Sequence, residues 1–340
     1  MEYRTLGRSG CVVSTFALGT MTFGAETDEA GSHDQLDTFI EAGGTLVDVA
    51  DVYADGASEE IVGRWLAARP ASVGDRVVLA TKGRFATGPD RNDAGLSRRH
   101  LRRALEASLR RLGVEHIDLY QVHAWDPLTP LDETLRFLDD AVSAGRIGYV
   151  GLSNFTAWQL QKAVDVATSR GWSVPVSLQP QYNLLVREVE LEIVPACLSE
   201  GLGLLPWSPL GGGWLTGKYV REQRPEGATR LGEDPERGME GWGRRSGSPR
   251  TWAVVDAVRE IADGRGASMA QVALAWVHDR PAVTSVILGA RTTAQLRQNL
   301  AAVGTHLEAA ETARLEGVSA LPVGDYPYGE MGVDQRARAL

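Results

Sequence analysis

Four residues of this chain carry side chains suited to proton transfer to a carbonyl oxygen. They are Asp48, Tyr53, Lys82 and His123, and each stands at or just beyond the end of a short apolar run. A free tyrosine has a pKa of about 10, which is too high for efficient acid–base catalysis near neutral pH. A neighbouring ammonium lowers that pKa, and a carboxylate paired with the lysine keeps the ammonium charged. A histidine can orient the substrate oxygen and stabilise the charge that develops on it. The set indicates proton-coupled carbonyl chemistry, provided that folding brings its members together.

Eight apolar runs supply candidate strands to position these residues. They are TFALGT (15–20), TLVDVAD (45–51), VVLATK (77–82), HIDLYQVH (116–123), IGYVGLSN (147–154), VSLQPQYN (176–183), LGLLPWSPL (202–210) and SVILGA (285–290). Near-continuous apolar runs are typical of parallel strands covered on both faces. Helical stretches separate all but the last two, which predicts an α/β protein with a (β/α)8 TIM barrel; an open doubly wound sheet is the alternative. A barrel gathers its strand ends on one face, so the four residues would meet there.

Helical periodicity is clearest over residues 97–112. Ser97 is a plausible N-cap, and four leucines recur at helical spacing: Leu101, Leu105, Leu109 and Leu112. Six arginines lie on the other faces: Arg98, Arg99, Arg102, Arg103, Arg110 and Arg111. Because the chain as a whole is acidic, we interpret them as a solvated helix face and not as a nucleic-acid site.

Two segments fall outside the repeat of strands and helices. Residues 1–14, with the glycines of GRSG, could form a hairpin that covers the bottom of the barrel. Residues 211–250 are rich in Gly, Arg, Glu and Pro and have little apolar periodicity, which predicts a long loop with few apolar contacts of its own. Residues 320–340 form a C-terminal tail. No linker is evident, so we expect one domain over 1–340.

Charge and composition exclude several kinds of partner. The net charge of −9 disfavours binding to nucleic acid and to anionic membranes. Only two cysteines occur, Cys11 and Cys197, which suggests a reducing compartment without disulfides. The first residues do not resemble a signal peptide, and no apolar run approaches the roughly 18 residues that cross a bilayer. We therefore expect a soluble cytoplasmic protein. The other five histidines show no metal-ligand spacing, so no metal site is predicted.

Several longer motifs surround the four residues. They include LGTMTFG (18–24), VDVADVY (47–53), ATKGRF (80–85), GLSRRHLRRALEASLRRL (95–112), YQVH (120–123), GLSNF (151–155), QPQYNLL (179–185), PWSPLGGG (206–213) and LGARTTAQLRQNL (288–300). Together they resemble the aldo-keto reductase superfamily over nearly the whole chain, and most closely the branch with bacterial oxidoreductases and potassium-channel beta subunits. The resemblance implies a (β/α)8 barrel and a nicotinamide-dependent reductase. It also implies that Asp48, Tyr53, Lys82 and His123 form the catalytic tetrad, with Tyr53 as the proton donor to a small carbonyl substrate.

The resemblance also implies a binding site for NADPH. Ser153, Asn154 and Gln179 would hold the nicotinamide carboxamide, Trp207 would stack on its ring, and Thr20 and Met21 would lie by its ribose. The pyrophosphate would lie against the loop after the seventh strand, through Ser208, Pro209, Leu210, Gly212 and Lys218, with Arg230 supplying further positive charge. The adenosine half would contact Gly289, Arg291, Gln295, Gln298 and Asn299. Arg291 would read the 2′-phosphate of NADPH, since guanidinium–phosphate pairs are charge-assisted and often bidentate.

The remaining candidates have simpler interpretations. Four aromatic residues on predicted loops at the catalytic end could line the substrate pocket: Phe23, Phe85, Trp125 and Trp214. Asp51 has no role in the tetrad and is interpreted as a structural acid. The segment GGWLTGKY (212–219) fits part of a phosphate-loop pattern, but Tyr219 stands where Ser or Thr should hold magnesium, so a nucleotide-triphosphatase site is not predicted.

Three functional possibilities remain open at this point. The first is an active carbonyl reductase. The second is a slow cofactor-binding regulatory subunit, and the third is a reductase for nucleotide-linked keto-sugars. A homo-oligomer is possible in each case.

Overall fold

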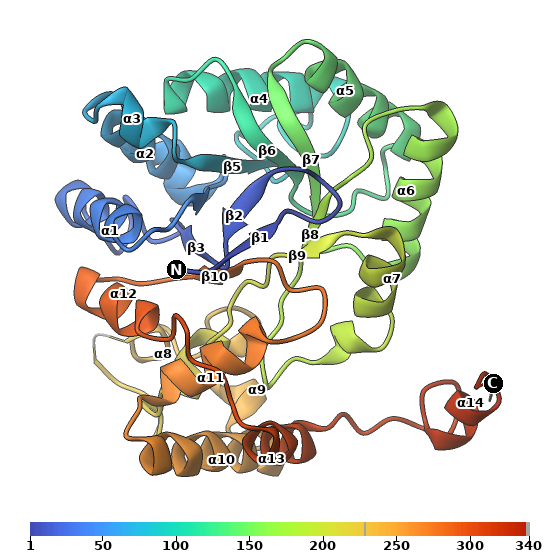
Figure 1. Cartoon of the computed structure of the whole chain (residues 1–340). Coiled ribbons are helices and arrows are strands. Elements are labelled where there is room, and N and C mark those ends of the chain that lie inside the picture. Colours follow the sequence, from blue (N-terminus) through green and yellow to red (C-terminus); the bar gives the residue numbers. More distant parts are fainter. Residues whose placement is uncertain (228, 338–340) are drawn as a thin grey trace.

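The computed structural model describes residues 1–227 and 229–337, so position 228 of the predicted insertion and positions 338–340 of the tail lie outside the described residues. Eight parallel strands form one curled sheet in the order β10-β3-β4-β5-β6-β7-β8-β9 (Figure 1). Their bounds are β3 (Phe16–Gly19), β4 (Leu46–Asp48), β5 (Val78–Gly83), β6 (Ile117–Val122), β7 (Ile147–Ser153), β8 (Ser177–Gln179), β9 (Gly203–Leu204) and β10 (Val286–Leu288). All eight predicted strands are present, most of them shorter than predicted.

The sheet closes between its first and last strands. Leu204 of β9 forms a parallel bridge with Val283, just before β10, and the Ile287 N–H of β10 donates to the Pro206 carbonyl at 3.0 Å. This closure confirms the (β/α)8 barrel and rules out the open doubly wound sheet. The predicted strand 202–210 ends early because Pro206 has no N–H to continue the ladder.

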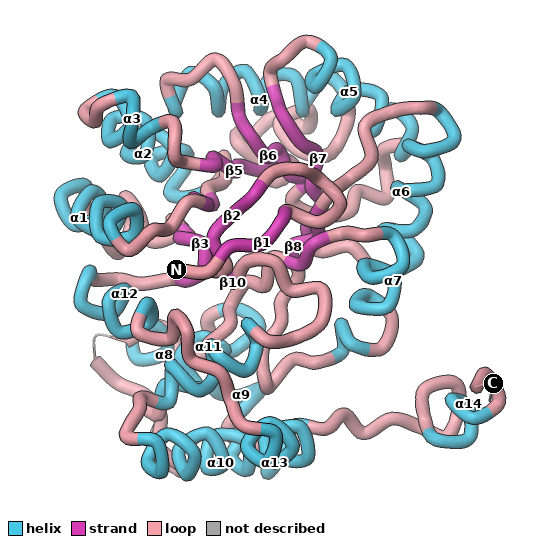
Figure 2. Tube along the Cα trace, in the orientation of Figure 1, coloured by secondary structure: helices cyan, strands magenta, loops and turns pink. Residues whose placement is uncertain are grey.

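Helices surround the barrel on its outer face (Figure 2). Their bounds are α1 (Glu29–Glu41), α2 (Ala57–Ala67), α3 (Ala71–Gly74), α4 (Arg98–Leu112), α5 (Leu131–Ser143), α6 (Ala157–Arg170), α7 (Ile193–Glu200), α8 (Arg230–Glu233), α9 (Trp242–Arg245), α10 (Pro249–Arg265), α11 (Met269–His278), α12 (Thr293–Leu300), α13 (Ala309–Ser319) and α14 (Glu330–Asp334). Short 3-10 turns cover Tyr53–Gly56, Glu188–Glu190, Gly211–Thr216 and Gly238–Glu240. Within the described residues, no helix combines the length and the apolar character needed to span a membrane.

Helix α4 follows the sequence prediction closely. The Ser97 side chain caps it by accepting from the His100 N–H, and the four predicted leucines are buried. Most of its arginines face solvent, but Arg111 does not fit that interpretation. Arg111 is partly buried and pairs with the fully buried Glu59 of α2. The pattern of α4 alone could not show this pair, because the acid comes from another helix.

The predicted N-terminal hairpin is present and covers the bottom of the barrel. Strands β1 (Tyr3–Thr5) and β2 (Val12–Ser14) pair antiparallel, and buried Leu6 and Val13 pack against residues inside the barrel. Gly7 has a φ of +53°, and a Cβ there would lie 2.1 Å from the Val176 carbonyl oxygen, so this approach requires glycine. With one end closed in this way, the other end of the strands remains for the functional site.

The segment 211–250 differs from the predicted loop with few apolar contacts. Trp214, Tyr219 and Leu231 are buried, and the Trp214 ring stacks on Trp242 with centroids 5.2 Å apart. Trp252 of α10 completes an aromatic cluster with its ring edge-on to Trp214. No periodic pattern marks this cluster in the sequence, because its members come from separate turns and helices.

Candidate active site

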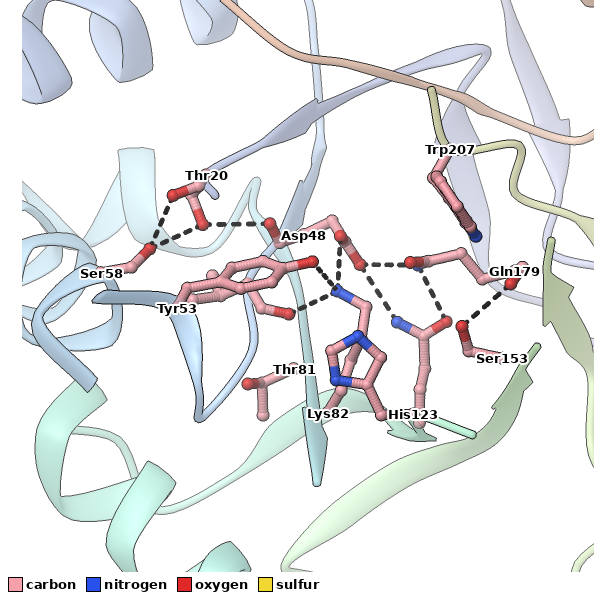
Figure 3. Close-up of polar contacts among 12 residues, drawn as sticks. Thr20, Asp48, Tyr53, Ser58, Thr81, Lys82, His123, Ser153, Gln179 and Trp207 are labelled. Carbon is pink, nitrogen blue, oxygen red and sulfur yellow. Dashed lines mark hydrogen bonds and ion pairs between the residues drawn. The ribbon is translucent and has the colours of Figure 1, made fainter. Parts of the chain in front are cut away.

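Asp48, Lys82 and Tyr53 form one contiguous hydrogen-bonded cluster at the carboxyl ends of β4 and β5 (Figure 3). The Lys82 ammonium lies 2.6 Å from Asp48 Oδ2 and 3.2 Å from the Tyr53 hydroxyl, and it also donates to the Val49 carbonyl at 2.7 Å. Lys82 is fully buried and Asp48 is 3% exposed. Each proton of the ammonium thus has an acceptor, which fixes the lysine beside the phenol.

The second oxygen of Asp48 is held by two amides. Gln121 Nε2 and Gln179 Nε2 donate to Asp48 Oδ1 at 3.1 and 2.8 Å, and Gln179 also donates to the Gln121 amide oxygen at 3.2 Å. Gln121 was not among the predicted site residues. The signal for it was a polar residue two positions before His123 in the run HIDLYQVH, since alternate residues of a strand point to the same face. Gln179 was predicted to hold the cofactor's carboxamide. In the structure its side-chain NH2 group donates to Asp48 and to Gln121 instead.

Buried hydroxyls complete the cluster from the side of β3. The Thr20 hydroxyl donates to the Asp48 carbonyl at 3.1 Å, and the Ser58 hydroxyl of α2 lies 2.9 Å from Thr20 Oγ1. Thr20 is fully buried, whereas the next residue, Met21, is 43% exposed at the mouth of the barrel. Only Met21 of this pair therefore has a free side chain.

Burial raises the pKa of the Tyr53 phenol above its usual value of 10, and the Lys82 ammonium only partly offsets that rise. This differs from the expectation that lysine would lower the tyrosine pKa below the ordinary value. Burial lowers the pKa of Lys82, but the charge of Asp48 and the hydrogen bonds to Asp48 and Tyr53 more than compensate, and the net pKa of Lys82 is raised. At neutral pH the cluster therefore presents a protonated phenol beside an ammonium, which is the form that can give up a proton.

His123 stands next to this cluster as a neutral imidazole. Burial, with further effects of Lys82 and Arg84, lowers the pKa of His123 from 6.5 to about 2. Its ring lies edge-on to Tyr53 and to Phe85, with centroids 6.1 and 4.6 Å away. A neutral ring carries one N–H donor, so His123 can bind a carbonyl oxygen but is a poor proton source.

The residues predicted around the nicotinamide form a network of their own. The Asn154 side-chain amide donates to the His123 carbonyl at 2.9 Å and to the Ser153 hydroxyl at 3.1 Å, while its oxygen accepts from the Trp207 indole at 3.1 Å. Asn154 has a φ of +54°, a strained conformation for a residue with a side chain. The network ties the Trp207 ring to the strand end that carries His123.

The predicted pyrophosphate loop has the backbone shape that close approach to an anion needs. Ser208, Gly212 and Gly213 all have positive φ angles, and the Gly212 N–H donates to the Ser208 hydroxyl at 3.2 Å. Pro209 and Leu210 complete the turn, and Leu210 packs against the core. Unexpectedly, the buried carboxyl of Glu240 lies 3.2 Å from the Ser208 hydroxyl. Glu240 was not predicted as a site residue, because it lies outside every motif in the sequence.

Cations gather around this loop. Arg291 and Arg230 are both near enough to Lys218 for their charges to affect it: partial burial and the two arginines lower the pKa of Lys218. Burial and the nearby Arg237 lower the pKa of Arg230, whose buried Nε has no hydrogen-bond partner within residues 1–227 and 229–337. Mutually repelling cations with an unused donor are suited to an anionic ligand.

Acids from two loops partly neutralise these cations. Arg291 makes a bidentate pair with Glu233 of α8, both contacts being 2.8 Å, and lies 3.3 Å from Glu26. Glu26 also pairs with Arg237. These contacts link the loop after β3 to the loop after β10 through the 211–250 segment.

The other predicted adenosine contacts cluster around β10 and α12. Exposed Gly289 accepts a hydrogen bond on its carbonyl from the buried Asn299, at 3.3 Å. Gln295 accepts from the Arg291 N–H at 2.9 Å, and Gln298 is exposed on the same helix. Folding thus brings these residues to one side of the barrel mouth.

Two of the four predicted substrate residues are poorly placed for that role. Phe23 is fully buried in the core, and Trp214 is 1% exposed within the aromatic cluster of the insertion, so neither side chain is free to line a pocket. Both errors arose because an aromatic residue on a loop gives no sign of which way it points. Phe85 is partly exposed beside His123, and Trp125 is partly exposed against Phe155.

Asp51 belongs to a different buried group, behind the strands. Its side chain is 2% exposed, and neither carboxyl oxygen has a hydrogen-bond partner in the described part of the chain. Burial and the nearby Glu59 raise the pKa of Asp51 from 3.8 to about 7, although Arg111 partly opposes this. Glu59 itself accepts from the Thr81 hydroxyl at 2.6 Å and from Arg111 Nε at 2.7 Å. This group faces α2 and α4 and not the barrel mouth.

Comparison with known proteins connects this arrangement to a family. Residues 15–320 match the family described as "Aldo/keto reductase family". The chain is 37% identical to the uncharacterized oxidoreductase YrpG of Bacillus subtilis, with 96% of this chain and 98% of that protein covered. It is 36% identical to versiconal hemiacetal acetate reductase of Aspergillus parasiticus, over 93% and 96% of the two chains. It is also 36% identical to an Arabidopsis thaliana protein described as "Probable voltage-gated potassium channel subunit beta", over 89% and 91%.

Proposed function

Since the chain belongs to the aldo/keto reductase family, we propose that it reduces an aldehyde, ketone or keto-sugar to an alcohol with NADPH as the hydride donor. The observation that carries this proposal is the contact of Lys82 with both Asp48 and the Tyr53 hydroxyl, with neutral His123 beside them. A protonated phenol, a fixed ammonium and a neutral imidazole donor together suit a carbonyl oxygen that becomes an alcohol.

Each side chain has a separate part in this mechanism. A bound nicotinamide supplies the hydride that reaches the carbonyl carbon. Tyr53 donates its hydroxyl proton to the carbonyl oxygen, and the adjacent Lys82 ammonium stabilises the phenolate that remains. Asp48 holds Lys82 in place and charged, and His123 directs an N–H at the carbonyl oxygen. Oxidation of an alcohol would use the same groups in reverse.

The residues around the loop 208–213 fit the anionic half of such a cofactor. The unpartnered Arg230 Nε and the neighbouring Lys218 and Arg291 provide positive charge, and the backbone of the glycine turn can approach phosphate oxygens closely. Ser153, Asn154 and Trp207 would hold the nicotinamide end. Glu240 would place a carboxyl next to the pyrophosphate, so binding requires that it be protonated or turned away.

The direct test is a turnover screen with aldehydes, ketones and keto-sugars that follows NADPH absorbance. We expect steady oxidation of NADPH with at least one class of carbonyl. If saturating NADPH binds but no class of carbonyl is reduced by the purified protein, the proposed reductase activity is wrong.

A variant of Arg291 tests the preference for NADPH. Loss of one charge-assisted phosphate contact costs roughly 1.5–3 kcal/mol, so Arg291→Ala should weaken NADPH binding about 10- to 100-fold and NADH binding much less. Arg297→Ala, which removes an exposed arginine from α12, the helix that follows Arg291, is the matched control and should leave both affinities unchanged. Equal losses for both cofactors in Arg291→Ala would show that this residue does not read the 2′-phosphate.

The chain is also similar to a protein described as a channel beta subunit. This similarity supports a second candidate function, that of a regulatory subunit with slow turnover. Burst kinetics separates the two. One rapid turnover followed by tight retention of NADP+ favours the regulatory subunit, whereas a linear progress curve favours the reductase.

A further inference from the structure

A second group of ligand-type side chains lies far from the tetrad, at the opposite end of the barrel. His278 ends α11, Asp279 follows it, and His306 lies in the turn between α12 and α13. One ligand atom from each lies within 4.8 Å of the other two. The His278 ring stacks on Phe16, the first residue of β3, whereas the catalytic residues lie where the strands end. Nothing in the proposed reductase mechanism uses this group.

Two distances within the group are slightly shorter than the edges of a metal coordination shell. Asp279 Oδ1 lies 2.8 Å from His278 Nδ1 and 3.1 Å from His306 Nδ1. In a tetrahedral Zn²⁺ site with bonds of about 2.0–2.1 Å, ligand atoms are about 3.3–3.4 Å apart. The Asp279 and His306 side chains are 28% and 55% exposed, so a retreat of a few tenths of an ångström is sterically open to them. We propose that His278, Asp279 and His306 bind one divalent transition-metal ion of the Zn²⁺ class through both Nδ1 atoms and the carboxylate, with water as the fourth ligand.

The surroundings of the two rings agree with metal on the Nδ1 side. Glu2 lies on the opposite side, 3.3 Å from His306 Nε2 and 3.4 Å from His278 Nε2. A metal at Nδ1 leaves the proton on Nε2, where it can be donated to Glu2, and a carboxylate behind a ligating histidine is the usual arrangement in metal sites. Arg4 also lies on the Nε2 side, 3.3 Å from His278 Nε2, and is held by the His278 and Val283 carbonyls at 2.9 and 2.7 Å. A guanidinium can only donate, so the Arg4 contact to His278 Nε2 must open when Nε2 carries the proton, while the two contacts to backbone carbonyls can remain.

A metal here would connect three separate parts of the chain. Its ligands come from the end of α11 and from the turn after α12, and Glu2 adds the N-terminal hairpin through the histidines. Because the tetrad lies at the other end of the strands, the ion should stabilise the fold without entering the reaction. The site could not be predicted from the sequence, because His278 and His306 are too far apart along the chain to form a metal-binding motif.

Cobalt provides a spectroscopic test on the full-length, untagged protein after metal is removed with chelator. One equivalent of Co²⁺ should produce the visible d–d absorption of a tetrahedral site, and one equivalent of Zn²⁺ should abolish it. Thermal unfolding should shift upward with Zn²⁺ concentration, as expected for a ligand that binds only the folded state. His306→Ala should weaken binding at least about 100-fold, and Glu2→Gln about 10- to 100-fold, as for loss of an outer-shell carboxylate.

His116→Ala is the matched control, since His116 is an exposed histidine away from this group. It should bind Co²⁺ as the unaltered protein does. No d–d absorption at one equivalent would overturn the proposal, and so would an affinity that His306→Ala leaves unchanged. Equal losses in His306→Ala and His116→Ala would show scattered surface binding and would overturn it as well. The outcome does not depend on the reductase activity.

Discussion

Asp48 and Asp51 are three residues apart at the end of β4 and are equally buried, yet their surroundings are opposite. Asp48 points into the barrel and receives hydrogen bonds from Lys82, Gln121 and Gln179. Asp51 points toward α2 and α4, where neither of its oxygens has a hydrogen-bond partner in the described residues. A buried carboxylate is stable only when it is paired and hydrogen-bonded. Asp48 has such partners, whereas burial and the nearby Glu59 raise the pKa of Asp51 to about 7.

The difference shows that burial alone does not identify a catalytic acid. Both carboxyl groups would be selected by a search for buried acids at strand ends. What separates them is the source of the neighbouring donors: those of Asp48 come from β5, β6 and β8, which converge on the barrel axis. The charges that most affect the pKa of Asp51 are Glu59, which raises it, and Arg111, which lowers it but is already bound by Glu59.

The largest expected effects are on the inward cluster. Tyr53→Phe removes only the hydroxyl, so turnover should fall by at least about 100-fold, as for loss of a positioned proton donor, while cofactor binding persists. Lys82→Met should be similarly harmful, because Lys82 is the main charge that lowers the Tyr53 pKa against the effect of burial. Steady-state kinetics and cofactor titration measure the two quantities separately. Near-normal turnover in folded Tyr53→Phe would refute the assignment of the proton donor.

A matched pair of substitutions compares the two acids directly. Asp48→Asn removes the carboxylate that fixes Lys82 and should lower kcat by at least about tenfold, since a mispositioned catalytic group can cost about 100-fold. Asp51→Asn should change kcat far less, because Asp51 makes no hydrogen bond to the cluster. Both variants are to be assayed with the same substrate. If Asp51→Asn reduces kcat as much as Asp48→Asn does, the two acids act together and the contrast between them is wrong.

The smallest expected effect is a pH-dependent change in the free energy of unfolding that comes from Asp51 and not from Asp48. The pKa of Asp51 is about 7 in the folded protein and 3.8 as the reference value, so folding favours the protonated form. The stability that this proton provides is present below about pH 4 and is lost as pH rises toward 7. At one pKa unit per 1.36 kcal/mol, the loss between pH 5 and 8 is roughly 2–3 kcal/mol. Asp51→Asn cannot lose a proton, so its free energy of unfolding should rise relative to the unaltered protein over that range.

Urea unfolding at pH 5 and at pH 8 measures this change. Asp55→Asn is the control. Asp55 is exposed in the turn Tyr53–Gly56 that follows Asp51, and the substitution likewise replaces a carboxyl group by an amide. The pH dependence of Asp51→Asn is measured against that of Asp55→Asn and should exceed it. If the unfolding free energies of Asp51→Asn and the unaltered protein differ by the same amount at both pH values, the Asp51 carboxyl is already ionised at pH 5, and its assigned pKa of about 7 is wrong.

Predictions from the sequence are most accurate for elements whose structure depends on neighbouring residues. Helix α4 was predicted to within a residue, because Ser97 and the leucine repeat act locally. The strand after residue 202 was predicted too long, because an apolar run does not show where its backbone partner ends. Gln121, Glu240 and the Arg111–Glu59 pair were missed, since each depends on a partner that is remote in the chain.

The amino-acid sequence by itself determined the alternation of strands and helices, the barrel that follows from it, and the four side chains at strand ends. These depend on apolar periodicity and on residue type, which are local properties. Only the tertiary structure decided which acid is paired with a lysine, which tryptophan is buried, and that His278 and His306 meet across Asp279. Hydrogen-bond partners and desolvation depend on the atoms within a few ångströms in space. Those atoms come from parts of the chain whose positions are set only when the barrel closes.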